Sequence, residues 1–529
     1  MNNDYLKWNP FAVLSPMGAT DCYKCGHVFQ YPENSEFVYS NFTPRSSKHA
    51  GDIFTADDQK VVVWGLTAFV KWFLIYHFNE NFFGKSEQEA VGEYAELMDS
   101  LFGPGAIKVD HIRAVHRLGY LPIEIRALDE GSRVDFRIPT MTVKNTKPFA
   151  YWVVNYLETI LSAENWQPMT VATIAYEFRR VLEKYTSLTG TDRSFINWQG
   201  HDFSMRGMTG MMASANASSG HLTSFWGTDC IPAVEWARGY YNGAASPVLG
   251  GSVPATEHSV MCAGTMESEI ETFRRLMKIY PSGILSIVSD TWDYWQVITD
   301  YAVQLKNEIL ARTDDSFGNA KVVFRPDSGD PVKILSGYTA DEYTIRDGKF
   351  YANDTGKELM ECEVKGSVEC LWDIFGGATN DLGFRTLDRH VGLIYGDSIT
   401  IKRADEILRR LMDKKFAANN VVFGIGSFSY QYLTRDSFGF AMKATACTVA
   451  GEFRELYKDP KTDDGTKKSA RGLLRVEKVG DEYVLHERQT FEQEQTGELK
   501  VVFRDGELLC DTDIADVRHK LWGSALSLK

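Results

Sequence analysis

Cysteine, positive charge and long hydrophobic runs are all scarce in this sequence. Its 529 residues include eight cysteines at irregular spacing, which excludes a disulfide framework and favours a reduced, cytoplasmic setting. Cys22 and Cys25 have no second pair at zinc-ligand spacing and are interpreted as part of a loop or helix start. Lys and Arg number 57 against 71 Asp and Glu, giving a net charge of −14 without the basic footprint that nucleic acid requires. The expected partners are therefore small molecules, and an anionic one needs arginines concentrated locally.

Neither a signal peptide nor a membrane span is expected. The first residues, Met1–Lys7, lack a charged segment followed by an apolar one. The most apolar stretch, Val61–Phe78, has Lys71 near its centre and apolar residues at helical spacing. We therefore predict an amphipathic core helix there.

Short alternating runs of apolar and polar residues lie toward both ends of the chain. Such alternation is typical of an antiparallel sheet with one solvated face, which we predict here. The runs near the amino terminus are 36–42, 121–127, 131–138 and 141–143. Alternation returns after about residue 440, at 472–476, 482–485 and 501–503, and the polar, basic segment Lys458–Arg471 before them is predicted to be a mobile loop.

The middle of the chain has nearly continuous apolar runs, which are typical of parallel strands buried on both faces. These runs are Ile284–Val288, Val322–Phe324, Val391–Tyr395 and Val421–Phe423. A helix with one apolar stripe is predicted after Thr400, and strands alternating with helices indicate a parallel α/β barrel or a doubly wound sheet. An insertion occupies about 336–385, in which Asp347-Gly348 predicts a surface hairpin.

Polar or glycine residues follow each of the four runs. The carboxyl ends of parallel barrel strands converge on one mouth, so these residues are candidates for a site. They are Asp290, Arg325, Asp327, Asp397, Gly424 and Gly426. An aspartate there is equally the N-cap of the next helix, and for any single residue both interpretations stay open. Gly396 and the turn Gly424–Ser427 come late in the barrel, where backbone N–H groups commonly bind phosphate, and Arg325 and Arg435 are candidates to hold it.

One histidine stands out by its setting. His258 follows the Gly- and Pro-rich segment that begins at Gly250, at the predicted start of a helix. A histidine in such a place can act as acid, base or phosphate acceptor. The alternative, a hydrogen-bonded structural histidine, also stays open.

Eight segments, taken in order, carry a further signal. They are Asp21–Pro32, His201–Gly207, Gly227–Asp229, Ser252–Ser259, Val288–Asp290, Arg325–Pro331, Gly396–Asp397 and Leu433–Asp436. From about residue 12 to its end the chain resembles the nicotinamide phosphoribosyltransferase family, with the insertion as the main interruption. The resemblance implies a type II phosphoribosyltransferase fold of the α/β class, with an irregular parallel α/β barrel and an accompanying, mainly antiparallel α+β sheet domain. It also implies a homodimer with its two sites at the subunit interface.

This resemblance, with the patterns above, sets the expected domains. Residues 1–165 are expected to form the amino-terminal part of the sheet domain. Residues 166–440 are expected to form the barrel, which holds the nicotinamide and phosphoribosyl site and carries the insertion. Residues 441–529 are expected to complete the sheet domain with carboxy-terminal strands.

The resemblance also implies how the pyridine is held. Phe203 resembles one wall of the nicotinamide slot, and Tyr23 of the partner subunit resembles the other. A flat ring that becomes cationic in the product gains from aromatic faces. Asp229 resembles the acceptor of a hydrogen bond from the carboxamide, and it would repel nicotinate. Ser286 resembles a second polar contact to the amide, and Val323 is a further substrate-binding position.

The remaining roles concern phosphates and the metal, and they are likewise implied by the resemblance. Arg206 and Arg325 resemble the residues that hold diphosphate, while Asp327 and Asp397 resemble ribose ligands that adjoin Mg²⁺. His258 matches a histidine phosphorylated by ATP, oriented by Asp290. The positions matching the 5′-phosphate site are Gly396, Gly426, Ser427 and Arg435, and Arg45 and Lys443 match basic residues near it.

The function implied is synthesis of nicotinamide mononucleotide and diphosphate from nicotinamide and 5-phosphoribosyl 1-diphosphate. ATP is expected to stimulate it through a phosphohistidine, within NAD biosynthesis or salvage. A nicotinate-specific enzyme and a catalytically silent nucleotide-binding dimer are the alternatives. The chain departs from the family pattern at Cys22, at Ser204-Met205 and at Ser427-Phe428, where the family usually has serine, Gly-Tyr and glycines. A Cβ at Ser427 is expected to narrow the phosphate cradle.

Overall fold

The computed structural model describes residues 14–458 and 469–526, in two compact units. The first unit comprises Met1–Thr173, Glu235–Ser246 and Leu433–Leu521, and the second comprises Ile174–Val234, Pro247–Tyr432 and Trp522–Lys529. The predictions for Met1–Lys7 and for most of the loop after Lys458 fall outside the described residues. The domain limits expected near residues 165 and 440 stay a prediction.

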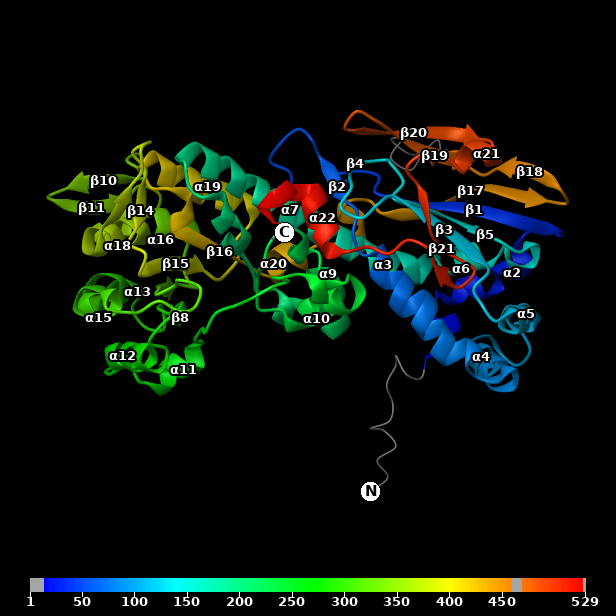
Figure 1. The fold of residues 1–529 in the computed structure, drawn as a ribbon, viewed down its shortest axis with the longest axis horizontal. Helices are drawn as coiled ribbons and strands as arrows, with labels where there is room; N and C mark the ends of the chain where they lie inside the picture. Colours follow the sequence, from blue (N-terminus) through cyan, green and yellow to red (C-terminus); the bar gives the residue numbers. More distant parts are fainter. Residues whose placement is uncertain (1–13, 459–468, 527–529) are drawn as a thin grey trace, which may run out of the picture. The chain divides into compact units, whose positions relative to one another are not determined.

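The first unit is built on a seven-stranded sheet with the order β18-β17-β1-β5-β3-β21-β22. Every neighbouring pair is antiparallel, which confirms the arrangement predicted from the alternating runs. The strands are β1 (Ser35–Thr43), β3 (Ile123–Ala127), β5 (Met141–Asn145), β17 (Ala441–Val449), β18 (Glu452–Glu455), β21 (Lys500–Arg504) and β22 (Glu507–Leu508). Strands from both ends of the chain therefore share one sheet (Figure 1).

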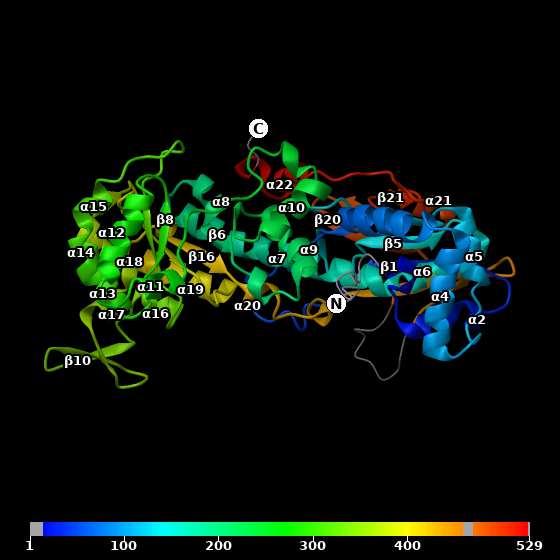
Figure 2. The same cartoon turned by 90° about the horizontal axis from the view of Figure 1, so that it is seen from below.

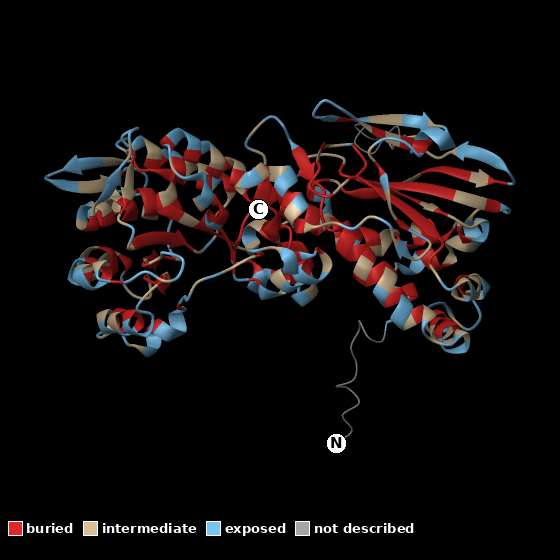
Figure 3. Ribbon diagram, viewed as in Figure 1, coloured by how far each residue is buried: buried red, intermediate tan, exposed pale blue. Residues whose placement is uncertain are grey.

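The expectation of one solvated face for this sheet is wrong. Tyr39 of β1 packs with Leu473 and Leu474 on one face, and its hydroxyl lies 3.3 Å from the Leu474 carbonyl. Those leucines belong to the hairpin of β19 (Leu473–Val479) and β20 (Glu482–Gln489). On the other face, Ser40 donates a 2.7 Å hydrogen bond to Asn155 of α6 (Val153–Tyr156). Because both faces are covered, even the polar positions of β1 are largely buried (Figure 3).

The apolar stretch after residue 60 forms a short strand and then a helix. Strand β2 (Lys60–Val62) pairs with β4 (Arg133–Asp135), and the helix begins at Leu66 as α3 (Leu66–Phe69) and continues in π-helical geometry over Val70–His77. The predicted apolar stripe of this helix is buried. The other helices of this unit, three of which (α7, α10 and α22) cross its limits, are α2 (His27–Gln30), α4 (Glu87–Phe102), α5 (Asp110–Leu118), α7 (Glu158–Thr189), α10 (Ile231–Tyr240), α21 (Phe491–Glu494) and α22 (Ile514–Trp522). Within the described residues no helix is both long and apolar enough to cross a membrane.

The second unit is built on a six-stranded sheet with the order β7-β6-β16-β15-β9-β8, in which all neighbours are parallel. The strands are β6 (Gly200–Asp202), β7 (Gly227–Thr228), β8 (Leu285–Val288), β9 (Val322–Arg325), β15 (Val391–Tyr395) and β16 (Val421–Ile425). Four of them are the predicted apolar runs. The segment Gly251–Thr256 bridges both edges, since Gly251 pairs with Gly227 and Ala255 with Ser286. This closing segment completes an irregular ring of strands, which agrees with the expected barrel.

Helices surround the parallel strands of the second unit (Figure 2). Helix α19 (Ile401–Asp413) starts where predicted, because the Thr400 side chain accepts a hydrogen bond from the Arg403 N–H at 3.2 Å. The remaining helices are α8 (Ile196–Gln199), α9 (Met211–Ser218), α11 (His258–Ala263), α12 (Glu269–Ile279), α13 (Tyr294–Gln296), α14 (Ala302–Gln304), α15 (Lys306–Leu310), α16 (Pro331–Ser336), α17 (Glu361–Lys365), α18 (Ser367–Phe375) and α20 (Ser427–Tyr430).

The insertion contains the predicted hairpin. Strands β10 (Tyr343–Arg346) and β11 (Lys349–Ala352) are joined at Asp347-Gly348, where both residues have positive φ, 51° and 77°. The hairpin continues into β12 (Glu358–Leu359) and projects from the unit (Figures 1 and 2). Two shorter strands follow it, β13 (Gly377–Thr379) and β14 (Arg385–Leu387).

A bidentate ion pair fixes the base of this hairpin, and its loss gives a testable prediction. Arg410 of α19 donates to both carboxylate oxygens of Glu342, at 2.6 and 2.7 Å. Burial acts to raise the pKa of Glu342, but hydrogen bonds from Arg410 and the Thr339 N–H outweigh burial and lower this pKa to about 2. The pair therefore stabilises the fold above the ordinary pKa of 4.5, and its contribution is lost as the pH falls toward 2. We expect E342Q to lower the free energy of unfolding by about 1.5 kcal/mol at neutral pH.

The measurement is denaturant unfolding at several pH values. The difference between E342Q and the unmodified protein should narrow below about pH 4.5. Glu358 offers a matched control, because its ion pair with Lys349 is half exposed on both sides and such pairs contribute little. An E358Q loss as large as that of E342Q would contradict the prediction.

Candidate active site

The carboxyl ends of the parallel strands bring the predicted residues of the second unit to one edge. Because the strands run the same way, residues that directly follow them share that edge. These residues are Phe203 after β6, Asp229 after β7, Asp290 after β8, Arg325 and Asp327 at the end of β9, Gly396 and Asp397 after β15, and Gly426 and Ser427 after β16. This edge therefore contains several carboxylates, together with glycines whose backbone N–H groups are not covered by a side chain.

A cavity of about 470 Å³ runs into the ring of strands from this edge. Five of the predicted residues line it, namely Phe203, Asp229, Ser286, Val323 and Arg325. Its size and mostly apolar wall suit a flat organic ring, with a few polar groups to orient it.

Asp229 accepts two side-chain hydrogen bonds in the cavity. Its Oδ1 lies 2.9 Å from Nε2 of His201 and also accepts the hydroxyl of Ser252. Burial acts to raise the pKa of Asp229, but the hydrogen bond and the charge of His201, the Ser252 hydroxyl and the charge of Arg325 outweigh it and hold the pKa below its ordinary value. Asp229 is therefore an anion at neutral pH.

Phe203 is held beside that carboxylate. Its ring lies 4.6 Å from the His201 ring, centroid to centroid, at 43°. A Cβ on Gly424 would lie 2.7 Å from Cδ2 of Phe203 and 2.8 Å from the Tyr395 carbonyl, so only glycine leaves the ring this position. The aromatic face and the carboxylate therefore lie on the same side of the cavity.

Two more cavity groups have unused hydrogen-bonding capacity. Ser286 is 4% exposed, and its hydroxyl oxygen has no partner in the described part of the chain. Arg325 is 9% exposed, and its Nη2 donates to the Thr256 carbonyl at 2.6 Å, while its Nε has no hydrogen-bond partner among the described residues but lies 3.8 Å from Oδ1 of Asp327. Buried polar groups left unpaired in this way point to a ligand or water at the site.

Asp290 links the predicted histidine to the β9 loop. Its Oδ1 lies 3.3 Å from Nε2 of His258, and its Oδ2 accepts the Asp327 N–H at 2.9 Å and the Ser328 hydroxyl at 2.6 Å. The Asp290 side chain is 3% exposed while that of His258 is 49% exposed. A buried carboxylate therefore orients an accessible imidazole.

The predicted magnesium ligands provide hard oxygen donors. Burial and the nearby carboxylates of Asp290 and Asp397 raise the pKa of Asp327, against Arg325 and His258, and its Oδ1 is buried without a hydrogen-bond partner in the described residues. Carboxylate oxygens are the ligands that Mg²⁺ prefers, and Oδ1 of Asp327 also lies 3.8 Å from Nε of Arg325. No group of three or more protein ligands gathers around one point in the described chain.

The two glycines predicted to bind phosphate, Gly396 and Gly426, differ in the space that they leave for a side chain. Gly396 has no room for a side chain, because a Cβ would collide with Oδ1 of Asp327, whereas a Cβ on Gly426 would meet nothing. The Ser427 side chain lies against Gly207, which directly follows the exposed Arg206. The hydroxyl of Ser427 is therefore directed at the Arg206 turn.

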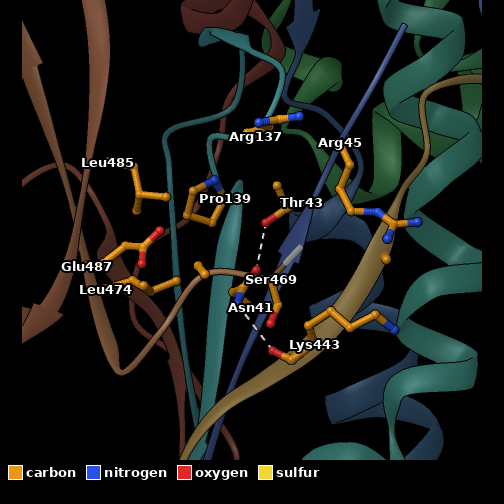
Figure 4. Close-up of a pocket in the computed structure, with 12 residues that line it drawn as sticks. Asn41, Thr43, Arg45, Arg137, Pro139, Lys443, Ser469, Leu474, Leu485 and Glu487 are labelled. Carbon is orange, nitrogen blue, oxygen red and sulfur yellow. Dashed lines mark hydrogen bonds between the residues drawn. The ribbon is translucent and has the colours of Figure 1, made fainter. Parts of the chain in front are cut away.

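Four predicted site residues belong to the first unit. Tyr23 is 61% exposed in the short 3₁₀ helix Cys22–Gly26, whose cysteines are free thiols. Arg45 and Lys443 line a cavity of about 250 Å³ together with Arg137 (Figure 4). Burial and the charges of Arg45 and Arg435, against Glu158, lower the pKa of Lys443. Cations crowded in this way favour an anion.

His201 and Ser252 are site residues that the sequence reasoning missed. Both bond Asp229 and line the large cavity, although each belongs to a segment already quoted for the resemblance. The three residues of β6 are too few for an alternation to be recognised in the sequence, and it is the structure that shows His201 and Phe203 both lining the cavity. Burial raises the pKa of Asp202 to about 6, and its Oδ2 has no partner among the described residues.

Comparison with known proteins identifies the family to which the chain belongs. A model of the nicotinate phosphoribosyltransferase (NAPRTase) family matches residues 198–507, more than half of the chain. A nicotinamide phosphoribosyltransferase of Acinetobacter baylyi is 52% identical over 509 residues, which cover 96% of this chain and 97% of that one. One of Mycoplasma pneumoniae is 32% identical over 474 residues, covering 87% and 95%.

Solved structures share the fold at lower identity. Human nicotinic acid phosphoribosyltransferase aligns with a TM-score of 0.53 and 14% identity, covering 96% of this chain and 94% of that one. The nicotinate-nucleotide pyrophosphorylase of Pyrococcus furiosus gives 0.52 and 13%, covering 97% and 96%. The chain therefore belongs to the nicotinate phosphoribosyltransferase family, has its type II fold and is a pentosyltransferase.

Proposed function

We propose that this protein makes nicotinamide mononucleotide and diphosphate from nicotinamide and 5-phosphoribosyl 1-diphosphate. The observation that carries the proposal is the ionised Asp229 beside Phe203 in the cavity. A carboxylate accepts a hydrogen bond from an amide and repels a carboxylate, so this site favours nicotinamide over nicotinate. The relative that is 52% identical carries the corresponding name.

The pyridine is held by an aromatic face and two polar groups. Its ring stacks on Phe203, its amide N–H groups reach Asp229, and Ser286 supplies a hydroxyl from β8. Val323 forms part of the apolar wall. In a dimer, Tyr23 of a second copy supplies the other ring face, which suits a ring that becomes cationic as its nitrogen bonds to C1 of the ribose.

The leaving diphosphate is held by arginines. The C1–O bond breaks with its electron pair going to the diphosphate, so a positioned cation lowers the barrier as negative charge collects there. Arg206 and Arg325 supply that charge. Asp327 and Asp397 would hold Mg²⁺ and bind the ribose hydroxyls, and the ion would supply positive charge to the diphosphate oxygens.

The 5′-phosphate is held by open backbone and basic side chains. Gly396, Gly426 and Ser427 provide the backbone and hydroxyl contacts. Arg435, Arg45 and Lys443 provide positive charge, and the lowered pKa of Lys443 indicates that it gains from an anion.

ATP stimulates the reaction through phosphorylation of His258, and this gives a second testable prediction. H258A should lose ATP stimulation but keep basal transfer, because His258 is not among the residues that line the pyridine cavity. D290N should lower both activities, because Asp290 also holds the Asp327 loop. The measurement is diphosphate release with and without ATP. Stimulation of H258A equal to that of the unmodified protein contradicts the phosphohistidine.

The proposed setting is a cytoplasmic homodimer that serves NAD biosynthesis. The test is diphosphate release by purified protein with nicotinamide, with nicotinate, and with each plus ATP. Preferential use of nicotinamide supports the proposal. Equal or greater use of nicotinate makes the protein an acid-specific enzyme, and binding of nicotinamide mononucleotide without turnover makes it a silent nucleotide-binding protein.

A further inference from the structure

One arginine of the first unit occupies a backbone position that suits glycine. Arg137 lies in the turn between β4 and β5, and its φ of 76° is the largest positive value of any non-glycine residue among those that the structure describes. Its N–H donates to the Pro44 carbonyl at 2.7 Å, which fixes the main chain in this conformation. A residue with a Cβ is strained at such a φ, whereas glycine is not. An arginine therefore costs stability at this position.

The side chain of Arg137 does not repay that cost within the fold. The residue is exposed, and its guanidinium makes no hydrogen bond or ion pair with any other residue in the described part of the chain. Arg488 of the same unit also has a positive φ, 56°, but its guanidinium pairs with Glu455 at 2.9 Å. A strained residue whose charged group has no partner around it points to a function at that place.

The cavity of about 250 Å³ that Arg137 lines contains two more cations, Arg45 and Lys443. Arg45 lies four residues after Asn41 of β1, and Lys443 of β17 is the register partner of Asn41. Alternate residues of a strand share a face, and so do antiparallel register partners, so Arg45 and Lys443 are presented together. Glu487, which also lines the cavity, lies on the side opposite Arg45 and Lys443 (Figure 4).

We propose that Arg137 is a further phosphate-binding residue, which acts with Arg45 and Lys443 on a phosphate group of the ribosyl substrate or of ATP. This inference rests on the proposed function, which assigns Arg45 and Lys443 to a phosphate. Three cations and one carboxylate line the cavity, so its charge is positive in a protein whose net charge is −14. A guanidinium presents its N–H groups in a planar fork that matches phosphate oxygens. A bound phosphate therefore takes up donors that the fold leaves unused and offsets the repulsion among the cations.

Three substitutions separate the charge of Arg137 from its backbone strain. R137G removes both, so we expect it to weaken phosphate binding about tenfold and to unfold at a higher temperature than R137A. R137A removes the charge but keeps a Cβ at the same φ, so it should lose as much affinity as R137G without the gain in stability. R137K keeps a charge but not the fork, and it should lose less affinity than R137A.

The measurement is titration calorimetry on the full-length protein, with 5-phosphoribosyl 1-diphosphate and with ATP in separate experiments. A loss of affinity confined to one ligand assigns the phosphate to that ligand, a loss for both assigns a shared site, and each of these results supports the proposal. Because the contact is between charges, raising the ionic strength from about 0.1 M to 1 M should weaken binding to the unmodified protein more than to R137G.

Two results overturn the proposal. One is unchanged affinity of R137G and R137A for both ligands. The other is a loss of affinity found only in variants that unfold at a lower temperature than the unmodified protein, since that loss belongs to the fold. Thermal unfolding of each variant separates these cases.

The chain offers a matched control in Arg488. R488G makes the same replacement at a positive φ, but Arg488 does not line the cavity, so both affinities should stay unchanged. A loss in R488G equal to that in R137G overturns a specific role for Arg137. If the unmodified protein converts neither pyridine, the proposed function has failed, and the calorimetry still tests Arg137. If nicotinamide mononucleotide forms while R137G keeps both affinities, only this inference has failed.

Discussion

Replacing Arg325 with lysine is expected to lower kcat about 100-fold while the protein stays folded. Arg325 is almost buried at the end of β9, with Nη2 donating to the Thr256 carbonyl at 2.6 Å and Nε 3.8 Å from Oδ1 of Asp327. Lysine keeps the charge but cannot hold Thr256 and an anion at once, because it lacks the planar fork of a guanidinium. Since charge develops on the diphosphate only as the C1–O bond breaks, the loss should fall on kcat.

The measurement is kcat for diphosphate release at saturating substrates, with thermal unfolding to check the fold. R274K is a suitable control, because Arg274 lies on the surface of α12 and pairs with Glu271 and Glu308. A kcat for R325K within tenfold of the unmodified protein would show that Arg325 is not the main cation at the leaving group.

Replacing Asp229 with asparagine is expected to change the ratio of kcat/KM for nicotinamide over nicotinate by about 100-fold or more. The side chain keeps its size but loses the charge that repels a carboxylate, and its new NH₂ group can donate to one. The loss of repulsion and the new donor both favour binding of nicotinate. Loss of the charged acceptor weakens binding of nicotinamide. Competition between the two pyridines at neutral pH measures the ratio.

Ser252 provides the matched control for that substitution. S252A removes one of the two bonds to Oδ1 and leaves the carboxylate in place. We expect its ratio to change by less than about tenfold, because one hydrogen bond is a smaller term than a full charge. A larger change in S252A than in D229N would place the discrimination in the geometry of the loop rather than in the charge.

The fold was predictable where the sequence repeats one environment over several residues. The four apolar runs became β8, β9, β15 and β16, and Asp347-Gly348 became the tip of a hairpin. Strands β6 and β7 were missed because they are only three and two residues long, too short for any periodicity. The solvated face was wrongly predicted because what covers a sheet comes from distant chain, here the hairpin that brings Leu474 onto Tyr39.

Only part of the candidate site could be predicted from the sequence. Carboxylates and glycines at strand ends were identifiable, because parallel strands bring their carboxyl ends to one edge. Nothing local assigns Phe203 or Asp229 to a pyridine, and that interpretation came from the resemblance. The bond between His201 and Asp229 joins two strands that are neighbours in space, so only the sheet order reveals it.

The closing segment determines which sequence changes this enzyme can tolerate between Gly251 and Thr256. Gly251–Thr256 joins two edge strands mainly through main-chain atoms, and the hydroxyl of Thr256 also accepts the Val288 N–H at 2.9 Å. Pro254, which has no N–H, takes part only through its carbonyl, which accepts the Ser286 N–H at 2.9 Å. Main-chain contacts of this kind tolerate many side-chain substitutions, but they depend on the number of residues in the segment. Adding or deleting one residue would direct the Ser252 side chain away from Asp229 and would shift Ala255 out of register with Ser286 of β8. In a mutational library, this stretch should accept substitutions and reject every insertion or deletion.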